Sequence, residues 1–360
     1  RLPFTAPHFC QMAKELAGDA PRIDTTLDPA AQKTATDILR GRSGWLAGQG
    51  IGSVAAVVLD PQTREVRALI GGTNWFGDPR FGQINGATIR RSPGSTLKPF
   101  LYAMAMDQGL IFPQSLLLDI PTGFAGYSPK NYDGLFLGRV SAEQALITSR
   151  NVPAVRLLNE VGPAPFLDLL RRGGLTTLDK PAAHYGLSLI LGGGETTLLA
   201  LTNLYAALAD GGLYRPAAIL AKSKPVRGER LFSPEACALT TDILTRLERP
   251  DLPTSWERAL AVPAVAWKTG TSFGHRDAWA VGVSAGHVIG VWVGNMDGTP
   301  IAGISGAVHA GPILFELFRA LEPHGSKAAA KTGLDIAEIE VCADSRQLLG
   351  PDCPRRVTAK

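Results

Sequence analysis

Residues 264–294 read AVAWKTGTSFGHRDAWAVGVSAGHVIGVWVG and contain three short runs of apolar residues. Each run is rich in Val, Ala and Trp, and a segment with polar or glycine residues separates it from the next. Runs of this length and composition, joined by short turns, are typical of consecutive β-strands in hairpins. We therefore predict three strands in this stretch, with His287 in the second turn.

The first part of the chain supplies another hairpin. Residues 53–60 (SVAAVVLD) predict a strand, and residues 65–70 predict the strand that returns beside it. Before this hairpin, Asp28 and Pro29 stand where the N-cap and the first residue of a helix are expected. We predict that this helix covers residues 30–40.

Helical patterns fill the middle of the chain. They dominate residues 141–210, whereas residues 1–22 and 109–140 show no regular pattern and are expected to be irregular. A further helix is expected at 311–321, after the three strands. Strands from both ends and helices from the middle predict an α/β (α+β) fold, with an antiparallel sheet of about five strands flanked by helices and an inserted all-helical lobe.

The composition is that of an ordinary globular protein, with 45% hydrophobic and 19% charged residues in a chain of 360. The formal net charge of +4 is spread along the chain without a block of Lys or Arg, so we expect no nucleic-acid partner. The longest apolar stretch, 278–294, carries His287 near its middle and divides into two strand-like halves. We therefore predict no transmembrane helix.

The four cysteines form no group with metal-ligand spacing, so we predict no zinc site and no cofactor. Cys10 and Cys237 stand alone, as expected of small buried residues. Cys342 and Cys353 lie in a tail that is rich in Pro, Gly and Asp and shows little helical or strand pattern. A short disulfide loop and two free thiols both remain open there.

Ser95 and Lys98 form the first candidate catalytic pair. A Pro-Gly pair precedes Ser95, and a helix that is apolar on nearly all sides follows, so Ser95 should lie at the start of a buried helix. Residues three apart share a helix face, so the Lys98 amine can reach the Ser95 hydroxyl and accept its proton if burial lowers the lysine pKa. The alternative is a surface lysine beside a serine that caps a helix.

Ser149, Arg150 and Asn151 form the second motif, between two helical segments. On its own, this triplet is better explained as a turn between the helices, since Ser and Asn are both favourable caps. Only its combination with the other motifs suggests a catalytic role.

The triplet Lys-Thr-Gly, the third motif, occurs twice. Lys268, Thr269, Gly270 and Thr271 follow an apolar strand, where a lysine can meet the carboxylate of an extended peptide and a glycine leaves room above it. The second copy, at 331–333, lies in an Ala-rich segment without strand pattern, which we expect to be a solvated linker. We therefore assign the function to Lys268.

In this order the three motifs resemble the set shared by penicillin-binding proteins and serine β-lactamases. Longer segments around them are similar to class A high-molecular-weight penicillin-binding proteins. These segments are RRSPGSTLKPF (90–100), NYDGLFLGRVSAEQALITSRNVPAVRLL (131–158), LILGGGETTLLALTNLYAALADGG (189–212) and WKTGTSFGHRDAWAVGVS (267–284).

The ends of the chain extend the resemblance. IDTTLDPAAQ (23–32) is similar to the junction between the glycosyltransferase and transpeptidase domains of class A enzymes. The opening RLPFTAPHF, which lacks the features of a signal peptide, and EVCADSRQLLGPDCP (340–354) resemble one subfamily of Gram-negative bacteria. This implies a linker remnant of the junction at 1–24, a transpeptidase domain at 25–325, and a linker with the start of a C-terminal extension at 326–360.

The resemblance implies a penicillin-binding protein fold and a serine-type D-Ala-D-Ala transpeptidase. Ser95 would attack the carbonyl of the penultimate D-Ala of a stem peptide, and Lys98 would accept its proton. Ser149 would pass a proton to the leaving amine, while Asn151 would hold Lys98 and the substrate amide. An acceptor amine would then complete the cross-link.

The same resemblance implies that Lys268 attracts the terminal carboxylate, assisted by the hydroxyls of Thr269 and Thr271 beside Gly270. The backbone N–H groups of Ser95 and Thr271 would form the oxyanion hole. The implied partners are peptidoglycan stem peptides, β-lactams and the membrane through an N-terminal anchor outside this chain. The implied location is the periplasmic face of the inner membrane, in a bifunctional synthase.

Two rivals share the motifs. A class A serine β-lactamase needs a Glu that activates water, and the nearest acids after Ser149 are Glu160 and Glu195, each of which is better explained as a helix-end charge. A β-lactam sensor domain would not follow a glycosyltransferase junction. Of the other polar residues, Asp277 is expected to fix a turn, and the segment 127–132 either lines the cleft or packs against the protein.

Overall fold

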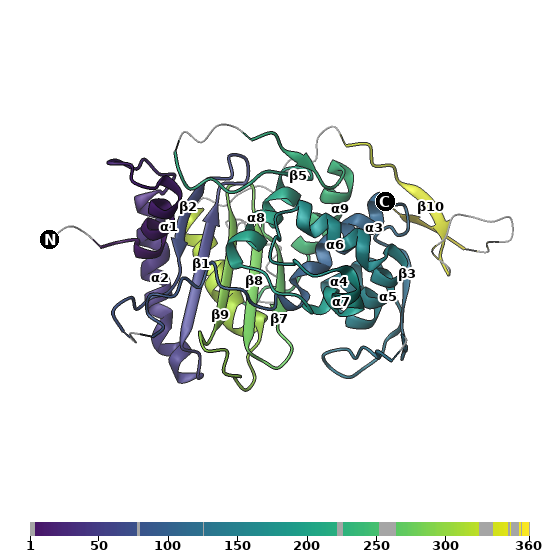
Figure 1. Cartoon of the computed structure of the whole chain (residues 1–360). Helices are drawn as coiled ribbons and strands as arrows, with labels where there is room; N and C mark the ends of the chain where they lie inside the picture. The colour runs from purple at the N-terminus through teal and green to yellow at the C-terminus, as the bar shows by residue number, and fades with distance from the viewer. Residues whose placement is uncertain are drawn as a thin grey trace.

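The computed structural model describes residues 4–77, 80–124, 126–221, 226–251, 264–323, 334–344, 346, 353 and 355–359. At its centre lies a five-stranded antiparallel sheet of order β2-β1-β9-β8-β7 (Figure 1). The strands are β1 (Ser53–Leu59), β2 (Val66–Ile70), β7 (Ala266–Thr271), β8 (Asp277–Val283) and β9 (Val288–Gly294). Two strands come from the start of the chain and three from its end, so the predicted fold class is confirmed.

The register joins the two ends of the chain in the middle of the sheet. Ser53 pairs with Gly294 and Leu59 with Val288, so β1 lies beside β9 along its whole length. β7 forms one edge of the sheet because it pairs with β8 alone. Lys268 therefore lies on an edge strand of the sheet.

Helices cover both faces of the sheet. Helices α2 (Pro29–Gly48) and α10 (Gly311–Leu321) pack on one face and α8 (Leu198–Ala209) on the other, while α1 (Pro7–Ala17) lies beside β2 (Figure 1). Every residue of β8 and β9 is buried as a result. This explains why their sequences are apolar throughout and show no polar alternation.

The remaining helices form a lobe beyond the β7 edge (Figure 1). They are η1 (Gly94–Leu97), α3 (Lys98–Asp107), α4 (Ala142–Ile147), α5 (Asn151–Val161), α6 (Pro163–Arg172), α7 (Ala182–Tyr185), η2 (Gly186–Leu191) and α9 (Pro234–Thr245). Within or beside the lobe, β3 (Leu116–Asp119) pairs with β4 (Gly138–Ser141), and β5 (Leu213–Tyr214) with β6 (Glu229–Arg230). The predicted helical lobe is thus accompanied by two short two-stranded sheets.

Other local predictions also need correction. The segment expected to be irregular at the start contains α1, which begins at Pro7 and buries Phe9. The helix expected at 30–40 continues to Gly48. The stretch 109–140 contains β3 and the first residues of β4, whose short strands are stabilised by pairing with each other rather than by a pattern that either shows alone.

The C-terminal tail contains a hairpin of β10 (Ile339–Cys342) and β11 (Arg356–Ala359) where little strand pattern was expected. Cys342 and Cys353 are not joined by a disulfide bond, and a hydrogen bond with Cys342 raises the pKa of the Cys353 thiol. Cys237 is buried as predicted, but Cys10 is exposed, because it lies on the outer side of α1. The second Lys-Thr-Gly copy, which begins at Lys331, lies outside the described residues.

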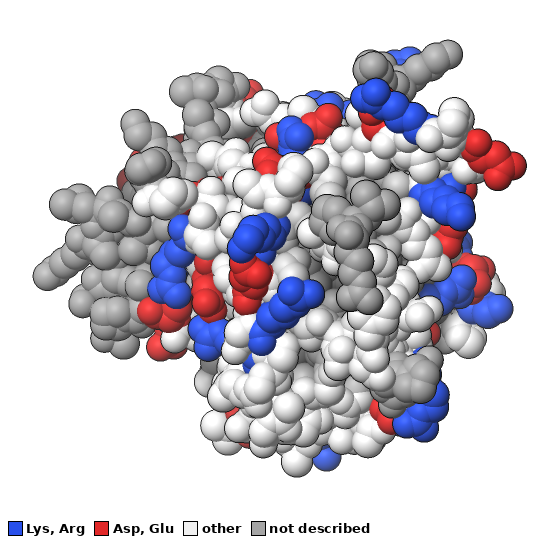
Figure 2. Space-filling model, turned by 90° about the vertical axis from the view of Figure 1, so that its left-hand side faces the viewer, with Lys and Arg blue, Asp and Glu red and all other residues white. Residues whose placement is uncertain are grey.

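Two surface properties follow from the described part of the chain. None of its helices combines the length and the apolar character that a membrane crossing requires. On the face shown in Figure 2, which is the side of α1 and α2 in Figure 1, positive and negative side chains are intermingled. Lys33 and Asp37 of α2, for example, form an exposed pair at 2.5 Å.

The N-cap of α2 provides a test of the fold. Asp28 Oδ1 accepts hydrogen bonds from the backbone N–H groups of Ala30 (2.8 Å) and Ala31 (3.1 Å). Asp28→Ala leaves both groups without this partner and should lower the free energy of unfolding by about 1 kcal/mol. Asp37→Ala on the same helix removes only an exposed pair and should change it by less than about 0.5 kcal/mol. Urea denaturation measures both, and equal losses would contradict the assigned cap.

Candidate active site

Ser95 lies in the 3₁₀ turn η1, directly before the buried helix α3. Pro99 is accommodated in the first turn of α3, where N–H groups need no intrahelical partner. Lys98, Phe100 and Tyr102 are completely buried, whereas Ser95 is partly exposed. Ser95 is therefore the partly exposed residue at the start of a buried helical element.

Two glycines let the Ser95 segment touch strand β7. A Cβ atom on Gly270 would lie 2.2 Å from the carbonyl oxygen of Pro93. Gly94 has a φ of +55°, and a Cβ atom there would lie 2.5 Å from the carbonyl oxygen of Thr271. Any larger residue would push η1 away from β7. The close approach brings the backbone of Ser95 next to that of Thr271.

Ser149 and Asn151 enter the same region from the turn between α4 and α5. Ser149 has a φ of +57°, which is uncommon for a residue with a side chain. In this conformation its carbonyl oxygen accepts a hydrogen bond from Lys98 Nζ at 2.6 Å. Asn151 Oδ1 accepts a second bond from the same amine at 2.7 Å.

The hydroxyl of Ser149 lies between two lysines. Its Oγ is 2.8 Å from Lys268 Nζ and 3.3 Å from Lys98 Nζ. Lys268 Nζ also donates to the carbonyl oxygen of Thr269 at 3.1 Å. The motif residues from three distant parts of the chain are thus joined by one hydrogen-bond network.

Burial changes the proton affinity of both amines. Desolvation places the pKa of Lys98 well below its usual range, and the positive charges of Lys268 and Arg150 lower it further. Desolvation lowers the pKa of Lys268 to about 7. An uncharged Lys98 amine can accept a proton, whereas a charged one cannot. The arrangement therefore favours a neutral Lys98 as a base.

The expected contact between Lys98 and Ser95 is replaced by others. Within the described part of the chain, the Lys98 amine bonds to Ser149 and Asn151, and the Ser95 hydroxyl forms no hydrogen bond. Lys268 lies within β7 rather than at the end of the strand, which continues through Thr271. The Thr271 hydroxyl accepts a bond at 3.3 Å from the N–H of Gly306, which begins a π-helical turn, η4 (Gly306–Ala310).

The sequence analysis missed the roles of two residues behind the Ser149 turn, Asp119 and Asn131. Asp119 is completely buried, and its carboxylate pairs with Arg150 at 2.9 Å and with Asn131 at 2.6 Å. A signal was available, since Asp119 ends the otherwise apolar strand LLLD (116–119), where a buried carboxylate needs a partner.

Residues outside the three motifs have structural explanations. Asp277 is buried on β8, accepts a bond from the Trp292 indole at 3.0 Å, and has a pKa raised by desolvation. Its N–H donates to Ser272 Oγ, which fixes the β7–β8 turn as expected. Glu160 and Glu195 are both exposed. Among the described residues, no cluster of His, Cys, Asp and Glu has the composition of a metal site.

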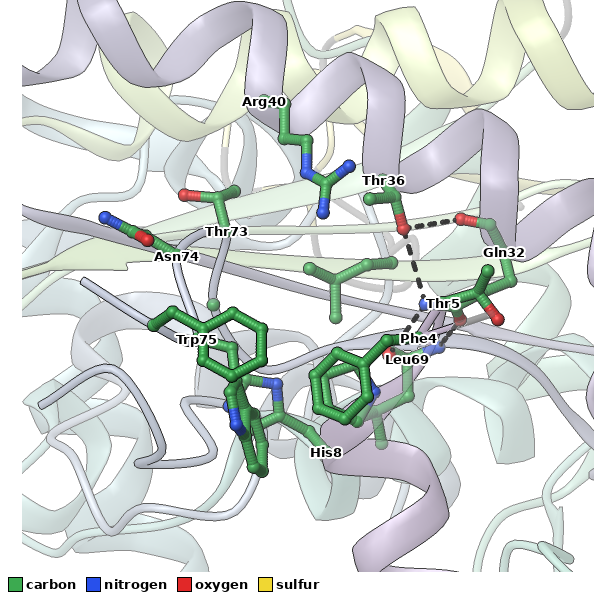
Figure 3. A pocket seen from close by; sticks show the side chains of 14 residues that line it. Phe4, Thr5, His8, Gln32, Thr36, Arg40, Leu69, Thr73, Asn74 and Trp75 are labelled. Carbon is green, nitrogen blue, oxygen red and sulfur yellow. Dashed lines mark hydrogen bonds between the residues drawn. The ribbon is translucent and has the colours of Figure 1, made fainter. Parts of the chain in front are cut away.

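Two cavities lie away from the motifs. One of about 210 Å³ lies between α1, α2 and the segment after β2, where Arg40 and Thr36 face the rings of Phe4 and Trp75 (Figure 3). The other, of about 560 Å³, is lined by aromatic and polar residues of the lobe, including Tyr127. Neither cavity is lined by a motif residue. The candidate site is therefore identified by its catalytic side chains and not by the size of a cavity.

Comparison with known proteins shows the family of the chain. The family model "Penicillin binding protein transpeptidase domain" matches residues 54–299. Penicillin-binding protein 1C of Escherichia coli (strain K12) is 39% identical over 317 residues, which make up 87% of this chain and 40% of that protein. Penicillin-binding protein 1A of Neisseria meningitidis (serogroup A, serotype 4A) is 32% identical over 262 residues, 67% of this chain and 32% of that protein. The chain thus spans less than half the length of these relatives.

Solved structures share the fold. The PonA1 protein from Mycobacterium tuberculosis, in complex with penicillin V, has a TM-score of 0.73 at 22% identity, covering 91% of this chain and 96% of that one. Penicillin-binding protein 1A from Haemophilus influenzae has a TM-score of 0.68 at 24% identity, covering 85% and 53%. The resemblance drawn from the motifs is confirmed, and so is the subfamily that the two ends suggested, that of penicillin-binding protein 1C. The chain belongs to the penicillin-binding protein transpeptidase domain family.

Proposed function

We propose that this domain is a peptidoglycan DD-transpeptidase that forms an acyl-enzyme at Ser95. The observation that carries the proposal is the buried amine of Lys98, held by Ser149 and Asn151 one helical turn after Ser95. A desolvated amine is the base that a weakly acidic serine hydroxyl needs. The family of the chain supports the proposed reaction class, and the geometry of the site supports the choice of residues.

The proposed reaction starts when the Ser95 hydroxyl attacks the carbonyl of the penultimate D-Ala of a stem peptide. Lys98 takes the hydroxyl proton, and Ser149 passes a proton to the nitrogen of the leaving D-Ala. An amine of a second stem peptide then attacks the ester and releases Ser95. Two peptides become joined by one new amide bond, and one D-Ala is released.

Electrostatic complementarity supports the assignment of the substrate carboxylate to Lys268. This amine belongs to the edge strand β7, in which Thr269 and Thr271 follow Lys268, and it donates to the hydroxyl of Ser149. A bound carboxylate favours the charged form of a lysine, so substrate binding should raise the lowered pKa of Lys268. The N–H groups of Ser95 and Thr271 are the proposed oxyanion hole, a role supported by the close approach of Gly94 to Thr271.

We further propose that β-lactams acylate Ser95, because the M. tuberculosis protein of the same fold has been solved with penicillin V. The resemblance of residues 23–32 to a domain junction, together with the greater length of the relatives, supports the proposal that the parent protein also carries a glycosyltransferase domain and an N-terminal membrane anchor, which would place this domain at the periplasmic face of the inner membrane. A β-lactamase would release the acyl group quickly, and a β-lactam sensor would form no cross-link.

Covalent labelling tests the nucleophile. Wild-type protein treated with a fluorescent penicillin should carry one adduct, mapped by mass spectrometry to the peptide that contains Ser95, and the adduct should persist for many minutes. Ser95→Ala should remove all labelling without changing the thermal unfolding midpoint by more than a few degrees. Formation of cross-linked dimer from lipid-linked substrate tests the transpeptidase itself. An adduct on Ser92 or Ser149 would refute the assignment, and rapid loss of the adduct would indicate a β-lactamase.

The two Lys-Thr-Gly copies give a matched pair of variants. Lys268→Ala removes a charge-assisted contact with the carboxylate and should lower the acylation efficiency roughly tenfold to a hundredfold, equivalent to about 1.5–3 kcal/mol. Lys331→Ala changes the same residue type in the same triplet and should alter the efficiency by less than about twofold. Stopped-flow measurement of penicillin acylation compares them. Similar losses at both positions would mean that Lys268 does not bind the carboxylate.

A further inference from the structure

Helix α5, which begins at the catalytic candidate Asn151, is capped by a residue from another element. Arg150 occupies the N-cap position but its side chain makes no cap hydrogen bond. Instead, Asn131 Oδ1, from the loop between β3 and β4, accepts the N–H of Asn151 (2.8 Å) and the N–H of Val152 (3.2 Å). Asn131 thus supplies the bonds that a local Ser or Asp would normally provide.

The carboxamide of Asn131 is itself fixed from its other side. Its Nδ2 donates to Asp119 Oδ1 at 2.6 Å and to the carbonyl oxygen of Leu135 at 2.8 Å. Asp119 Oδ2 in turn accepts a bond from Arg150 Nε at 2.9 Å and from the N–H of Leu137 at 3.1 Å. Both Asn131 and Asp119 are buried, so the carboxamide cannot exchange these partners for water.

The same loop also determines how Asn151 faces Lys98. Asn151 Nδ2 donates to the carbonyl oxygen of Lys130 at 2.9 Å, which leaves Oδ1 directed at the Lys98 amine. The neighbouring Ser149 is held in a left-handed conformation, which is strained for a residue with a side chain and persists only when the surroundings impose it. The bonds of residues 130 and 131 to the start of α5 are among the contacts that impose it.

We propose that Asn131 is a positioning residue of this active site, which caps α5 and thereby holds Ser149 and Asn151 around the Lys98 amine. The proposal rests on the proposed function, because it takes acylation of Ser95 as the reaction. Among the described residues, Asn131 forms no hydrogen bond with Ser95 or Lys98, so it acts through Ser149 and Asn151. Substitution of Asn131 should therefore slow the acylation of Ser95 even when the protein remains folded.

The first test compares two buried asparagines. Asn131→Ala should slow acylation by fluorescent penicillin about tenfold to a hundredfold, as expected when catalytic groups shift by about 1 Å. The control is Asn203→Ala on α8, because Asn203 is equally buried and its carboxamide also bonds to a distant backbone carbonyl, that of Arg215. This control should lose comparable thermal stability and acylate within about twofold of the wild type. Equal acylation rates for the two variants would overturn the proposal.

A double-mutant cycle separates positioning from general stability. If Asn131 positions Asn151, then Asn131→Ala should slow acylation by a smaller factor in an Asn151→Ala background than in the wild type. The same factor in both backgrounds would show that Asn131 acts independently of the Asn151 side chain and would overturn the proposal.

If Asn131→Ala does not fold, Asn131→Asp takes its place. This variant keeps an oxygen acceptor for α5 but replaces the donor that faces the Asp119 carboxylate, so it should acylate several-fold more slowly than Asn203→Ala. A wild-type rate for Asn131→Asp would overturn the proposal. An unlabelled wild-type protein would overturn the proposed function, and this inference with it, whereas a labelled wild type with an unaffected Asn131 variant would overturn the inference alone.

Discussion

Two lysine amines, both buried, lie within hydrogen-bond distance of one serine hydroxyl, that of Ser149. Two charged ammonium groups cannot be placed side by side in a desolvated region without a large penalty, so at least one of them must lose its proton. Lys98 is the one with a strongly lowered pKa, since it experiences desolvation together with the charges of Lys268 and Arg150. The rest of the site must therefore keep these two amines together and away from water.

Each part of the fold contributes to that burial. The sheet presents Lys268 on its edge strand, and two glycines, Gly94 and Gly270, allow η1 to contact the strand closely enough to exclude water. Helix α3 is buried on nearly all sides and carries Lys98 in its first turn. The left-handed turn at Ser149 then supplies a carbonyl oxygen and a hydroxyl to the two amines. The amines are thereby removed from solvent while their hydrogen bonds remain satisfied.

Local sequence signals were sufficient for the elements that form through their own pattern. The five strands are apolar runs bounded by turns, and Asp28 before Pro29 is a cap that acts within three residues. The motifs also indicated the candidate site, since each stands beside an element with a clear pattern. The predictions were wrong where stability comes from a partner elsewhere in the chain, as for β3 and β4, which are defined by pairing with each other. The role of Asn131 was missed for the same reason. It caps a helix that begins twenty residues later, and no local sequence pattern predicts such a contact.

The protonation state of Lys98 in the resting protein is the measurement that tests this account most directly. Side-chain amines labelled with ¹⁵N can be followed by NMR through a pH titration, with Lys98→Arg and Lys268→Arg used to assign the two signals. The account predicts that the Lys98 amine is neutral at pH 7 and that Lys268 titrates near neutrality, far below the usual value of about 10.4 for an exposed lysine. Two amines that both remain charged up to about pH 10 would contradict it. In that case burial would not leave Lys98 uncharged, so Lys98 could not act as the base. The Ser149 hydroxyl would then lie between two charged lysines.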